Sequence, residues 1–532
     1  MKWEILSRQK TNSPEDIVKV LLKNRGIKDK KEFFSPESPG KIKLESLGVS
    51  KVAIRRAIKR IKEAKKKKED VIVYGDYDAD GICATAIVWE ALHEFGVDVL
   101  PHIPDRFEEG YGLNAVSIEN VKLQMPNLKL IVTVDNGIVA YGGIKKAKEL
   151  GIDVVVIDHH AKGQKKNLSL SVLHSTSVCG SALAWFFAGE IGYKGGLELA
   201  AIGTIADQMP LTGVNRSLVK FGLAELNKTK RLGLKALFSD ARIENAGTYE
   251  VNYIIAPRIN AMGRLAQGID SLRLLCTRRE DKARELSKTL DRTNFERQRI
   301  VDKVVLHARS RVGDQKVIIL ADESYHEGVI GLAAGKLVEE FYRPAIVFSK
   351  KDKISKASAR SISGFNIIEN IRKLSSLYLE GGGHPMAAGF SIETEKINLF
   401  AKKINEISKK LLTAEVLEKK LKIDTELSFS NISWDLVKTI VEFEPFGLGN
   451  PAPTFVTRKA VVLDVRAVGR ESKHLKLKLK QNEHIFDAIY FGGGEIYPDL
   501  KLDAEIAIAY RLEENLWNGQ KTLQLVVKDV LN

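Results

Sequence analysis

The chain has 532 residues, of which 28% are charged and 44% are hydrophobic, and its formal net charge is +15. A chain of this length and composition can form three or four globular domains, and no run approaches the ~18 apolar residues of a membrane span. Such a positive charge favours a polyanionic partner, although lysine-rich surfaces also arise from genome bias or thermal adaptation.

The amino-terminus has no apolar signal core, and the three cysteines are scattered. Cys83, Cys179 and Cys276 form neither a disulfide framework nor a zinc pattern. Both features predict a protein of the reducing cytoplasm with no membrane partner.

Residues 1–50 are polar and predict short helices, one of them over Ile17–Lys23, which Gly26 closes. We expect this segment to be a helical appendage that packs on the domain after it. Residues 51–69 follow as a basic amphipathic helix, in which Lys65–Lys68 suit the carboxyl end of the helix dipole.

From residue 71 the pattern alternates between strand and helix, which is typical of a parallel sheet with helical crossovers. Apolar segments lie at 71–74, 97–103, 128–134, 153–157 and 197–205, and helices are predicted over 82–95 and 139–150. Four of these segments lead into carboxylates or imidazoles, and we expect the carboxyl ends of parallel strands to bring these groups to one edge. The residues concerned are Asp76, Asp78, Asp80, Asp135, Asp158, His159, His160 and Asp207.

So many acids at one edge predict a metal site, although isolated acids also cap helices. Oxygen ligands alone suit Mg²⁺ or Ca²⁺, and imidazole shifts the preference towards Mn²⁺ or a later metal. The number of acids is enough for two ions about 3.5–4 Å apart, as in two-metal phosphodiester hydrolysis.

The same residues resemble a known family. Asp76-x-Asp78-x-Asp80-Gly81, Val134–Gly137, Asp158–His160 and Gly203–Asp207 resemble, in order, the four motifs of the DHH phosphoesterase superfamily. Gly381–His384 resembles the signature of the DHHA1 domain. Within the superfamily the chain is most similar, from about residue 15 almost to its end, to the RecJ family of 5′-to-3′ exonucleases specific for single-stranded DNA. Further matching stretches are Pro104–Arg106 with 110–112, Pro257–Arg264, His326–Gly331 and Pro445–Pro451.

The resemblance implies a role for each matching residue. Asp80, Asp135, His159 and Asp207 would hold one Mn²⁺ or Mg²⁺ ion, and Asp76, Asp78 and Asp135 a second. His160 would stabilise the transition state or donate a proton, with Asp158 and Asp78 as further catalytic residues. The expected substrate-binding residues are Arg106, Tyr111, Arg258, Asn260, Arg264, His326, Arg360, Ser361, Gly382, Gly383 and His384. Some members carry histidine where this chain has Tyr74. Tyrosine in place of that histidine would loosen the first metal site.

The rest of the chain predicts a connecting helix and two more domains. Residues 270–311 favour one long helix, which could bridge two domains and line a cleft between them. The alternative is a charged connector on which Asn294 and Arg297 are only surface groups. Residues 316–392 favour α/β structure, in which the glycine run at 381 taken alone indicates a tight turn. Five strands between 454 and 530 favour an OB-type barrel, in which Lys476, Lys478 and Lys480 alternate with core leucines. A generic β-barrel with a solvated basic face is the alternative.

The predicted fold class is therefore α/β: a DHH parallel-sheet domain joined by a long helix to a DHHA1 α/β domain, plus a carboxyl-terminal OB-type β-barrel. The expected boundaries are 1–50 (appendage), 51–265 (DHH), 266–312 (connecting helix), 313–412 (DHHA1) and 413–532 (OB).

The predicted function is a metal-dependent 5′-to-3′ exonuclease on single-stranded DNA that releases mononucleotides in DNA recombination and repair. We expect a monomer, with a single-strand binding protein or a helicase as candidate partners. The alternatives are an oligoribonuclease or cyclic-dinucleotide phosphodiesterase of the superfamily, and a non-catalytic single-strand-binding relative.

Overall fold

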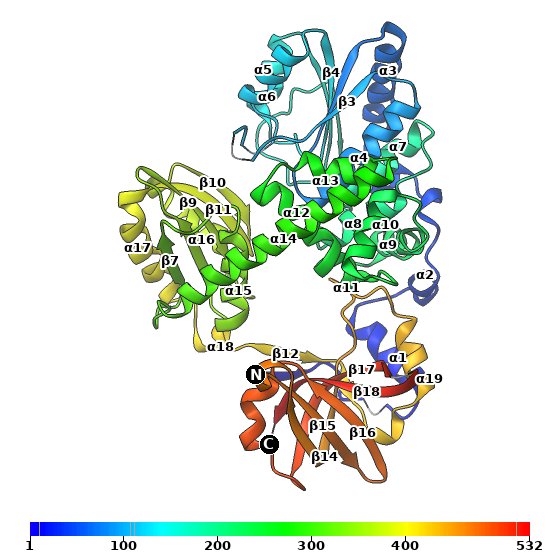
Figure 1. Cartoon of the computed structure of the whole chain (residues 1–532), viewed down its shortest axis with the longest axis vertical. Coiled ribbons are helices and arrows are strands. Elements are labelled where there is room, and N and C mark those ends of the chain that lie inside the picture. Colours follow the sequence, from blue (N-terminus) through cyan, green and yellow to red (C-terminus); the bar gives the residue numbers. More distant parts are fainter. Residues whose placement is uncertain (10, 107, 111, 518, 532) are drawn as a thin grey trace. The chain divides into compact units, whose positions relative to one another are not determined.

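The computed structural model describes residues 1–532 except 10, 107, 111, 518 and 532. The chain forms two compact units (Figure 1). The first comprises 1–43, 207–225 and 420–532, and the second comprises 44–206 and 226–419. Among the residues described, no helix combines the length and the apolar character that crossing a membrane requires.

The second unit contains the predicted parallel sheet. Its strands are β2 (Asp70–Tyr74), β3 (Val99–His102), β4 (Leu128–Val134), β5 (Asp153–Asp158) and β6 (Ser171–His174), in the order β3-β2-β4-β5-β6 and all parallel. Helices α5 (Ala115–Gln124) and α6 (Tyr141–Glu149) lie on one side of it, with α3 (Lys51–Lys67) and α7 (Gly180–Glu190) on the other (Figure 1). Because both faces are covered, the strands are continuously apolar rather than alternating.

The strand order places a switch point beside β2. The chain runs from β2 to β3 on one side and then crosses to β4 on the other side of β2. Ligands of open α/β sheets bind outside the carboxyl ends of the strands at such a point. The acidic loop after β2 and Asp135 after β4 both lie there.

One predicted strand is a helix. Residues 197–205 form part of α8 (Leu197–Ala206), which packs on α4 (Ala79–Glu94). A short apolar run does not distinguish a buried strand from a buried helix. Gly203 allows α8 to pack closely on the acidic loop. A Cβ on Gly203 would lie 2.2 Å from Asp80 Oδ1. The fifth strand of the sheet is β6, which the sequence did not predict.

The predicted connecting helix is two helices, α13 (Ile269–Cys276) and α14 (Glu280–Arg309). A π-helical turn at Val251–Ile255 leads into α12 (Ala256–Leu265), which packs along α14. The remaining helices between α8 and α12 are α9 (Gly213–Leu226), α10 (Leu232–Ala241) and α11 (Thr248–Glu250).

A second sheet follows α14, in the order β10-β11-β9-β8-β7. Its core includes Phe348, Phe390 and Phe400. The glycine run forms an exposed edge strand, β10, instead of a tight turn. The elements are β7 (Ile318–Asp322), α15 (Ile330–Phe341), β8 (Ala345–Ser349), β9 (Ile354–Arg360), α16 (Ile367–Arg372), β10 (Glu380–His384), β11 (Ala387–Glu393), α17 (Ile397–Lys409) and α18 (Ala414–Leu417).

The first unit contains a closed five-stranded barrel, as predicted for an OB-type fold. Its strands are β14 (Phe455–Val468), β15 (His474–Gln481), β16 (His484–Tyr490), β17 (Glu505–Trp517) and β18 (Gln520–Leu531). The ring closes because β14 pairs with both β15 and β17, while β18 pairs with both β16 and β17. The short β13 (Thr425–Glu426) joins β14. Lys476 and Lys478 are exposed between buried leucines, so β15 has the predicted basic face.

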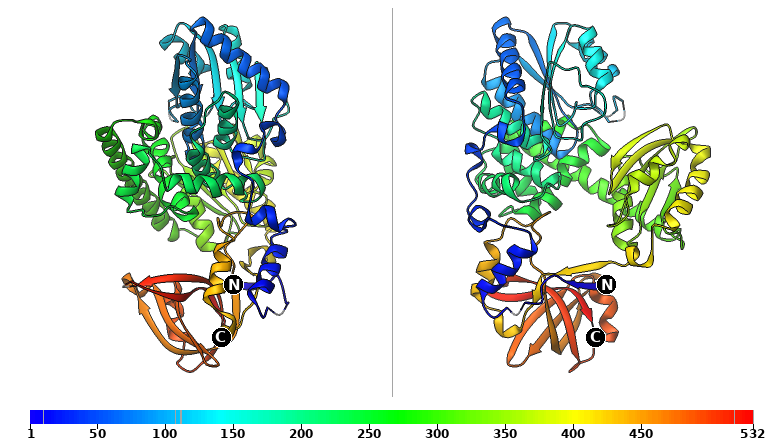
Figure 2. Two further views of the ribbon diagram at one scale, coloured as in Figure 1. Left: turned by 90° about the vertical axis from the view of Figure 1, so that its right-hand side faces the viewer. Right: turned by 180° about the vertical axis from the view of Figure 1, so that it is seen from behind.

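The expectation that the amino-terminal helices pack on the domain after them is wrong. Helices α1 (Pro14–Asn24) and α2 (Lys30–Phe34) share a core with α19 (Trp434–Val441) and the barrel. Arg25 Nη1 contacts Asp424 Oδ1 at 2.9 Å, and both side chains are buried. Strand β1 (Lys2–Ile5) pairs with β12 (Lys420–Ile423). The terminal amino group lies 3.7 Å from Asp529, so the two ends of the chain lie close together (Figure 2).

Candidate active site

The acidic loop after β2 is held by hydrogen bonds to its own backbone and to α7. Asp78 caps α4 and accepts from Gly81 N at 2.9 Å. Asp80 is buried and accepts from Gly180 N at 2.7 Å and from Ser181 N at 2.9 Å. Side chains are excluded at Gly81, where a Cβ would lie 2.6 Å from the Asp76 Cβ. The loop therefore fixes the three aspartates before any ligand binds.

Asp135 and His159 meet this loop from the ends of β4 and β5. Asp135 has a φ of +59° and is 2% exposed. His159 Nε2 lies 3.1 Å from Asp135 Oδ1 and 3.9 Å from Asp80 Oδ2. Asp207 follows α8 directly, so a single peptide bond fixes it to the end of that helix.

Three groups of these residues offer ligand atoms that all lie within 4.8 Å of one another. They are Asp135 with His159 and His160, Asp80 with His159 and Asp207, and Asp76 with Asp78 and Asp135. Each residue predicted as a metal ligand belongs to at least one group, and the groups share Asp135 and His159. Mixed oxygen and imidazole donors in overlapping groups suit divalent metals such as Mn²⁺ or Mg²⁺.

Two of the carboxyl groups have raised pKa values, as expected for a site that binds a cation. Burial, reinforced by the charges of Asp80 and Asp78, holds the pKa of Asp135 well above its usual value. Burial and the charge of Asp80 also raise the pKa of Asp78. Clustered acids with raised pKa values are stabilised by a cation, which replaces the proton that each would otherwise bind.

His160 is oriented by Asp158. His160 Nδ1 lies 2.8 Å from Asp158 Oδ1, which also accepts from the His160 backbone N–H at 3.0 Å. Asp158 Oδ2 accepts from Ile138 N at 2.8 Å. Burial alone would raise the pKa of Asp158, but the hydrogen bonds from His160 outweigh it and the pKa lies below its usual value. Because Asp158 holds Nδ1, any proton that His160 gives to a substrate must come from Nε2.

Four arginines form an electrostatically linked cluster near the acidic loop. Burial, with the neighbouring charges of Arg106, Arg360 and Arg297, lowers the pKa of Arg264 to about 10, so it stays a cation at neutral pH. Arg106 also lies over the ring of Tyr77, 5.3 Å from its centroid. Like charges that act on one another favour binding of an anion such as phosphate. The alternative in which Asn294 and Arg297 are surface groups does not hold: Asn294 is buried, and Arg297 is half-buried and acts on Arg264.

Several predicted substrate residues have other partners within the fold. Arg258 forms an ion pair with Asp291 at 2.8 Å. Asn260 accepts from Ala79 N at 2.7 Å and so supports the start of α4. Ser361 is buried and donates to Phe365 O at 2.6 Å. His326 Nδ1 accepts from Gly328 N at 3.1 Å.

The remaining predicted substrate residues lie on exposed backbone or outside the described part of the chain. Gly382, Gly383 and His384 are exposed on β10. A Cβ on Gly383 would lie 2.3 Å from Ala387 O, whereas one on Gly382 would meet no atom within 4 Å. The prediction for Tyr111 falls outside the described residues.

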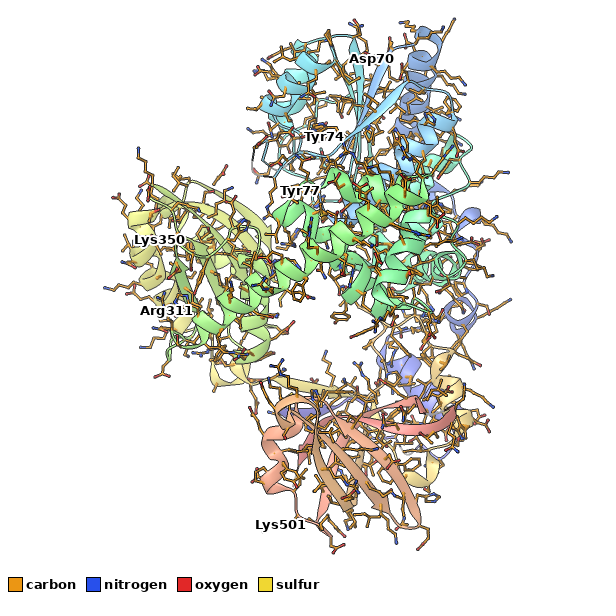
Figure 3. The ribbon with its side chains drawn as sticks, in the orientation of Figure 1. Asp70, Tyr74, Tyr77, Arg311, Lys350 and Lys501 are labelled. Atoms are coloured by element: carbon orange, nitrogen blue, oxygen red, sulfur yellow. The ribbon has the colours of Figure 1, made fainter. Side chains whose placement is uncertain are left out.

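Tyr74 is directed away from the acids. Its hydroxyl donates to Gly112 O at 3.2 Å, its side chain is fully buried, and its ring centroid lies 4.9 Å from that of His102. Figure 3 labels Asp70 and Tyr74 at the two ends of β2 and Tyr77 in the loop beyond. Burial raises the pKa of Tyr74, which excludes phenolate ligation at neutral pH.

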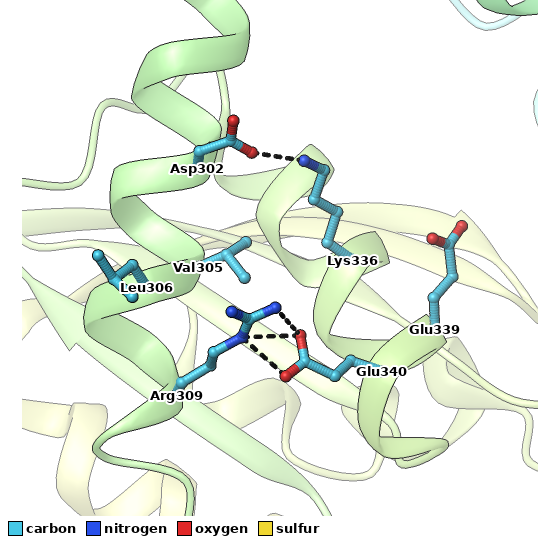
Figure 4. Close-up of a pocket in the computed structure, with 7 residues that line it drawn as sticks. All are labelled: Asp302, Val305, Leu306, Arg309, Lys336, Glu339 and Glu340. Carbon is cyan, nitrogen blue, oxygen red and sulfur yellow. Dashed lines mark hydrogen bonds and ion pairs between the residues drawn. The ribbon is translucent and has the colours of Figure 1, made fainter. Parts of the chain in front are cut away.

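A groove between α14 and α15 is a different kind of feature. It is lined by Asp302, Val305, Leu306, Arg309, Lys336, Glu339 and Glu340 (Figure 4). Lys336 pairs with Asp302 at 2.6 Å, and Arg309 pairs with Glu340 at 2.8 Å. Both of its cations are paired with carboxylates, and only Glu339 adds a further charge, so it lacks the concentration of like charges found in the acidic and arginine clusters.

Comparison with known proteins agrees with this geometry. Family models match residues 70–206 (DHH family, N-terminal domain), 314–410 (DHHA1 domain) and 423–529 (RecJ OB domain). The single-stranded-DNA-specific exonuclease RecJ of Haemophilus influenzae is 32% identical over 519 residues, which cover 89% of this chain and 90% of that protein. The chain belongs to the RecJ family.

Other relatives of this RecJ-family chain support the assignment. The exonuclease RecJ of Bacillus subtilis is 36% identical over 497 residues, which cover 90% of this chain but 63% of that longer protein. The crystal structure of Thermus thermophilus RecJ with Mn²⁺ superposes with a TM-score of 0.86 at 28% identity, covering 100% of this chain and 79% of the other. The Mg²⁺ complex of the same protein gives a TM-score of 0.77. These similarities confirm the predicted fold class.

Proposed function

We propose that the chain is a metal-dependent exonuclease that degrades single-stranded DNA from the 5′ end and releases mononucleotides, in DNA recombination and repair. The observation that carries the proposal is that two opposite features lie within electrostatic reach of each other. An acidic cluster with overlapping ligand groups includes Asp78, and the charge of Asp78 acts on Arg264 of the arginine cluster. A phosphodiester needs both a cation at the reacting phosphorus and cations around its other oxygens.

The residues present fit a pair of divalent ions. Within the described residues Asp135 Oδ1 is buried and makes no hydrogen bond, although His159 Nε2 lies 3.1 Å away. Asp80, Asp135, His159 and Asp207 would hold one ion, and Asp76, Asp78 and Asp135 the other. When bound, Mn²⁺ or Mg²⁺ lowers the pKa of a coordinated water and stabilises negative charge on phosphoryl oxygens.

His160 acts from the ring edge opposite Asp158. The hydrogen bond between Nδ1 and Asp158 fixes the plane of the ring. Nε2 then donates to a nonbridging oxygen or to the leaving group. Asp158 is a positioning residue in this scheme, because its two oxygens are taken by Ile138 and His160.

The arginine cluster would bind the phosphates of the strand, with Arg264 nearest the metals and Arg360 contributed by the DHHA1 sheet. Exposed Lys476 and Lys478 on β15 would also bind the DNA backbone. The 5′-to-3′ direction follows from the family resemblance.

A direct assay tests the proposal. Purified protein with Mn²⁺ or Mg²⁺ is given 5′- or 3′-labelled single strands, a duplex and RNA. We expect the 5′ label to be released first, as a mononucleotide, from single-stranded DNA. Earlier release of the 3′ label would refute the direction, and a preference for RNA would favour an oligoribonuclease.

A further inference from the structure

The loop Pro445–Pro451, which resembles a family motif, packs against the segment that follows Asp207. Leu211 N donates to Leu448 O at 2.7 Å. A Cβ on Gly449, whose φ is +78°, would lie 3.2 Å from Pro210 Cβ and 3.5 Å from Thr212 Cγ2. The loop therefore contacts residues 210–212 through its backbone.

Arg216 fixes the same segment one helical turn later. It is 1% exposed, and its guanidinium lies 3.8 Å from the centroid of the Phe33 ring. It donates to the carbonyls of Phe33 at 2.7 Å, Phe443 at 2.9 Å and Glu444 at 2.7 Å. Through these backbone carbonyls the buried guanidinium ties the start of α9 to the chain just before the loop.

Asn450 makes the loop rigid. It is fully buried, and its Nδ2 donates to Phe443 O at 2.7 Å and to Pro445 O at 2.9 Å. Its Oδ1 accepts from Arg25 Nε at 3.1 Å. Backbone hydrogen bonds join Gly447 and Asn450 in both directions. The loop is thus a preformed surface and not a flexible connection.

We propose that the loop Pro445–Pro451, together with Arg216, positions the metal ligand Asp207. Asp207 stands three residues before Pro210, with α8 ending at Ala206 on its other side. Its backbone is thus restrained on both sides, by α8 and by the loop. The proposal rests on the proposed role of Asp207 as a metal ligand. Groups that orient ligands typically change metal affinity 10- to 100-fold when altered.

Two matched glycine substitutions in the full chain test the proposal. Gly449→Asn places a side chain against Pro210 and Thr212. Gly492→Asn is the control, because Gly492 has the same φ of +78° and a Cβ there would meet no atom within 4 Å. Asparagine is the residue besides glycine that best tolerates this conformation. The readouts are Mn²⁺ binding by calorimetry, single-strand binding in EDTA, and thermal unfolding.

We expect Gly449→Asn to weaken binding of one Mn²⁺ about 10-fold, with single-strand binding unchanged, and Gly492→Asn to leave Mn²⁺ binding unchanged. Equal Mn²⁺ affinities in the two variants would overturn the positioning role. A third variant, Asp207→Asn, distinguishes a failure of the positioning role from a failure of the proposed function. If Asp207→Asn weakens Mn²⁺ binding and Gly449→Asn does not, only the positioning role is wrong. If Asp207→Asn has no effect, the ligand assignment fails, and the positioning role fails with it.

Discussion

Removing one charge from the acidic cluster should stabilise the metal-free protein while abolishing its response to metal. Asp135→Asn is the best perturbation. Asparagine accepts the φ of +59° at this position, and its amide oxygen still faces His159 Nε2. The substitution therefore changes charge with little change of shape.

The expected gain follows from the distances. Ligand atoms of Asp76, Asp78 and Asp135 lie within 4.8 Å of one another, and two unit charges at that separation repel by about 3.5 kcal/mol at an effective dielectric constant of 20. The folded protein relieves part of this by binding protons, as the raised pKa of Asp135 shows. We therefore expect Asp135→Asn to raise the stability in EDTA by about 1–3 kcal/mol.

Adding Mn²⁺ should narrow or reverse this difference in stability between the variant and the unaltered protein. Mn²⁺ at 100 times its dissociation constant stabilises the unaltered protein by about 2.7 kcal/mol, and the variant, which lacks a ligand shared by two of the groups, should gain almost nothing. Thermal unfolding measures the stability of both proteins in EDTA and in Mn²⁺. Asp70→Asn, at the other end of β2, is the control for loss of a carboxylate outside the cluster. A variant that is less stable than the parent in EDTA and is still stabilised by Mn²⁺ would refute the reasoning.

Three further predictions concern catalysis, pH and substrate. His160→Gln should lower nuclease turnover about 10²- to 10⁴-fold while leaving Mn²⁺ affinity, measured by calorimetry, nearly unchanged; a parallel loss of Mn²⁺ binding would contradict the role. Because the pKa values of Asp78 and Asp135 are raised, protonation of these carboxyls stabilises the folded protein, and this stabilisation is lost as the pH rises through those pKa values. The Tm gained on adding Mn²⁺ should therefore increase from pH 5.5 to pH 8, and a gain independent of pH would argue against proton displacement. Arg264→Gln should weaken single-strand binding and reduce its salt slope by about one, while Arg258→Gln, whose guanidinium is paired with Asp291, should leave that slope unchanged.

The sequence predicted the acidic edge because the relevant signals are local. Strands β2, β4 and β5 are short apolar runs that end at the acids, and parallel topology alone brings those ends together. Prediction from the sequence failed where a local signal is ambiguous or absent. Leu197–Ala206 reads equally well as a buried strand or a buried helix, and in the structure it is a helix that packs on α4 and α7.

Long-range partners explain the other differences. Arg25 and Asp424 are 399 positions apart, so nothing near α1 indicates that it packs on the barrel. Arg258 and Arg264 belong to one sequence motif and looked equivalent as phosphate ligands. The structure separates them, since Arg258 forms an ion pair with Asp291, whereas no ion pair of Arg264 is seen among the described residues and its guanidinium donates to Gly328 O. Arg297 was missed because a charged residue on a long helix is most often exposed.

Tyr74 shows how the proposed metal site can form without a histidine at this position. In the described residues its hydroxyl donates to Gly112 O, in the segment that also carries Arg106, so the side chain ties β2 to a segment with a proposed phosphate ligand. The ligand atoms of Asp76, Asp78 and Asp135 still approach within 4.8 Å without it. An ion held by these three carboxylates would have only oxygen donors from the chain, which favours Mg²⁺ or Mn²⁺ over softer metals. An ion beside His159 would keep an imidazole, so the two proposed positions would differ in their donors and should differ in their preference between Mn²⁺ and Mg²⁺.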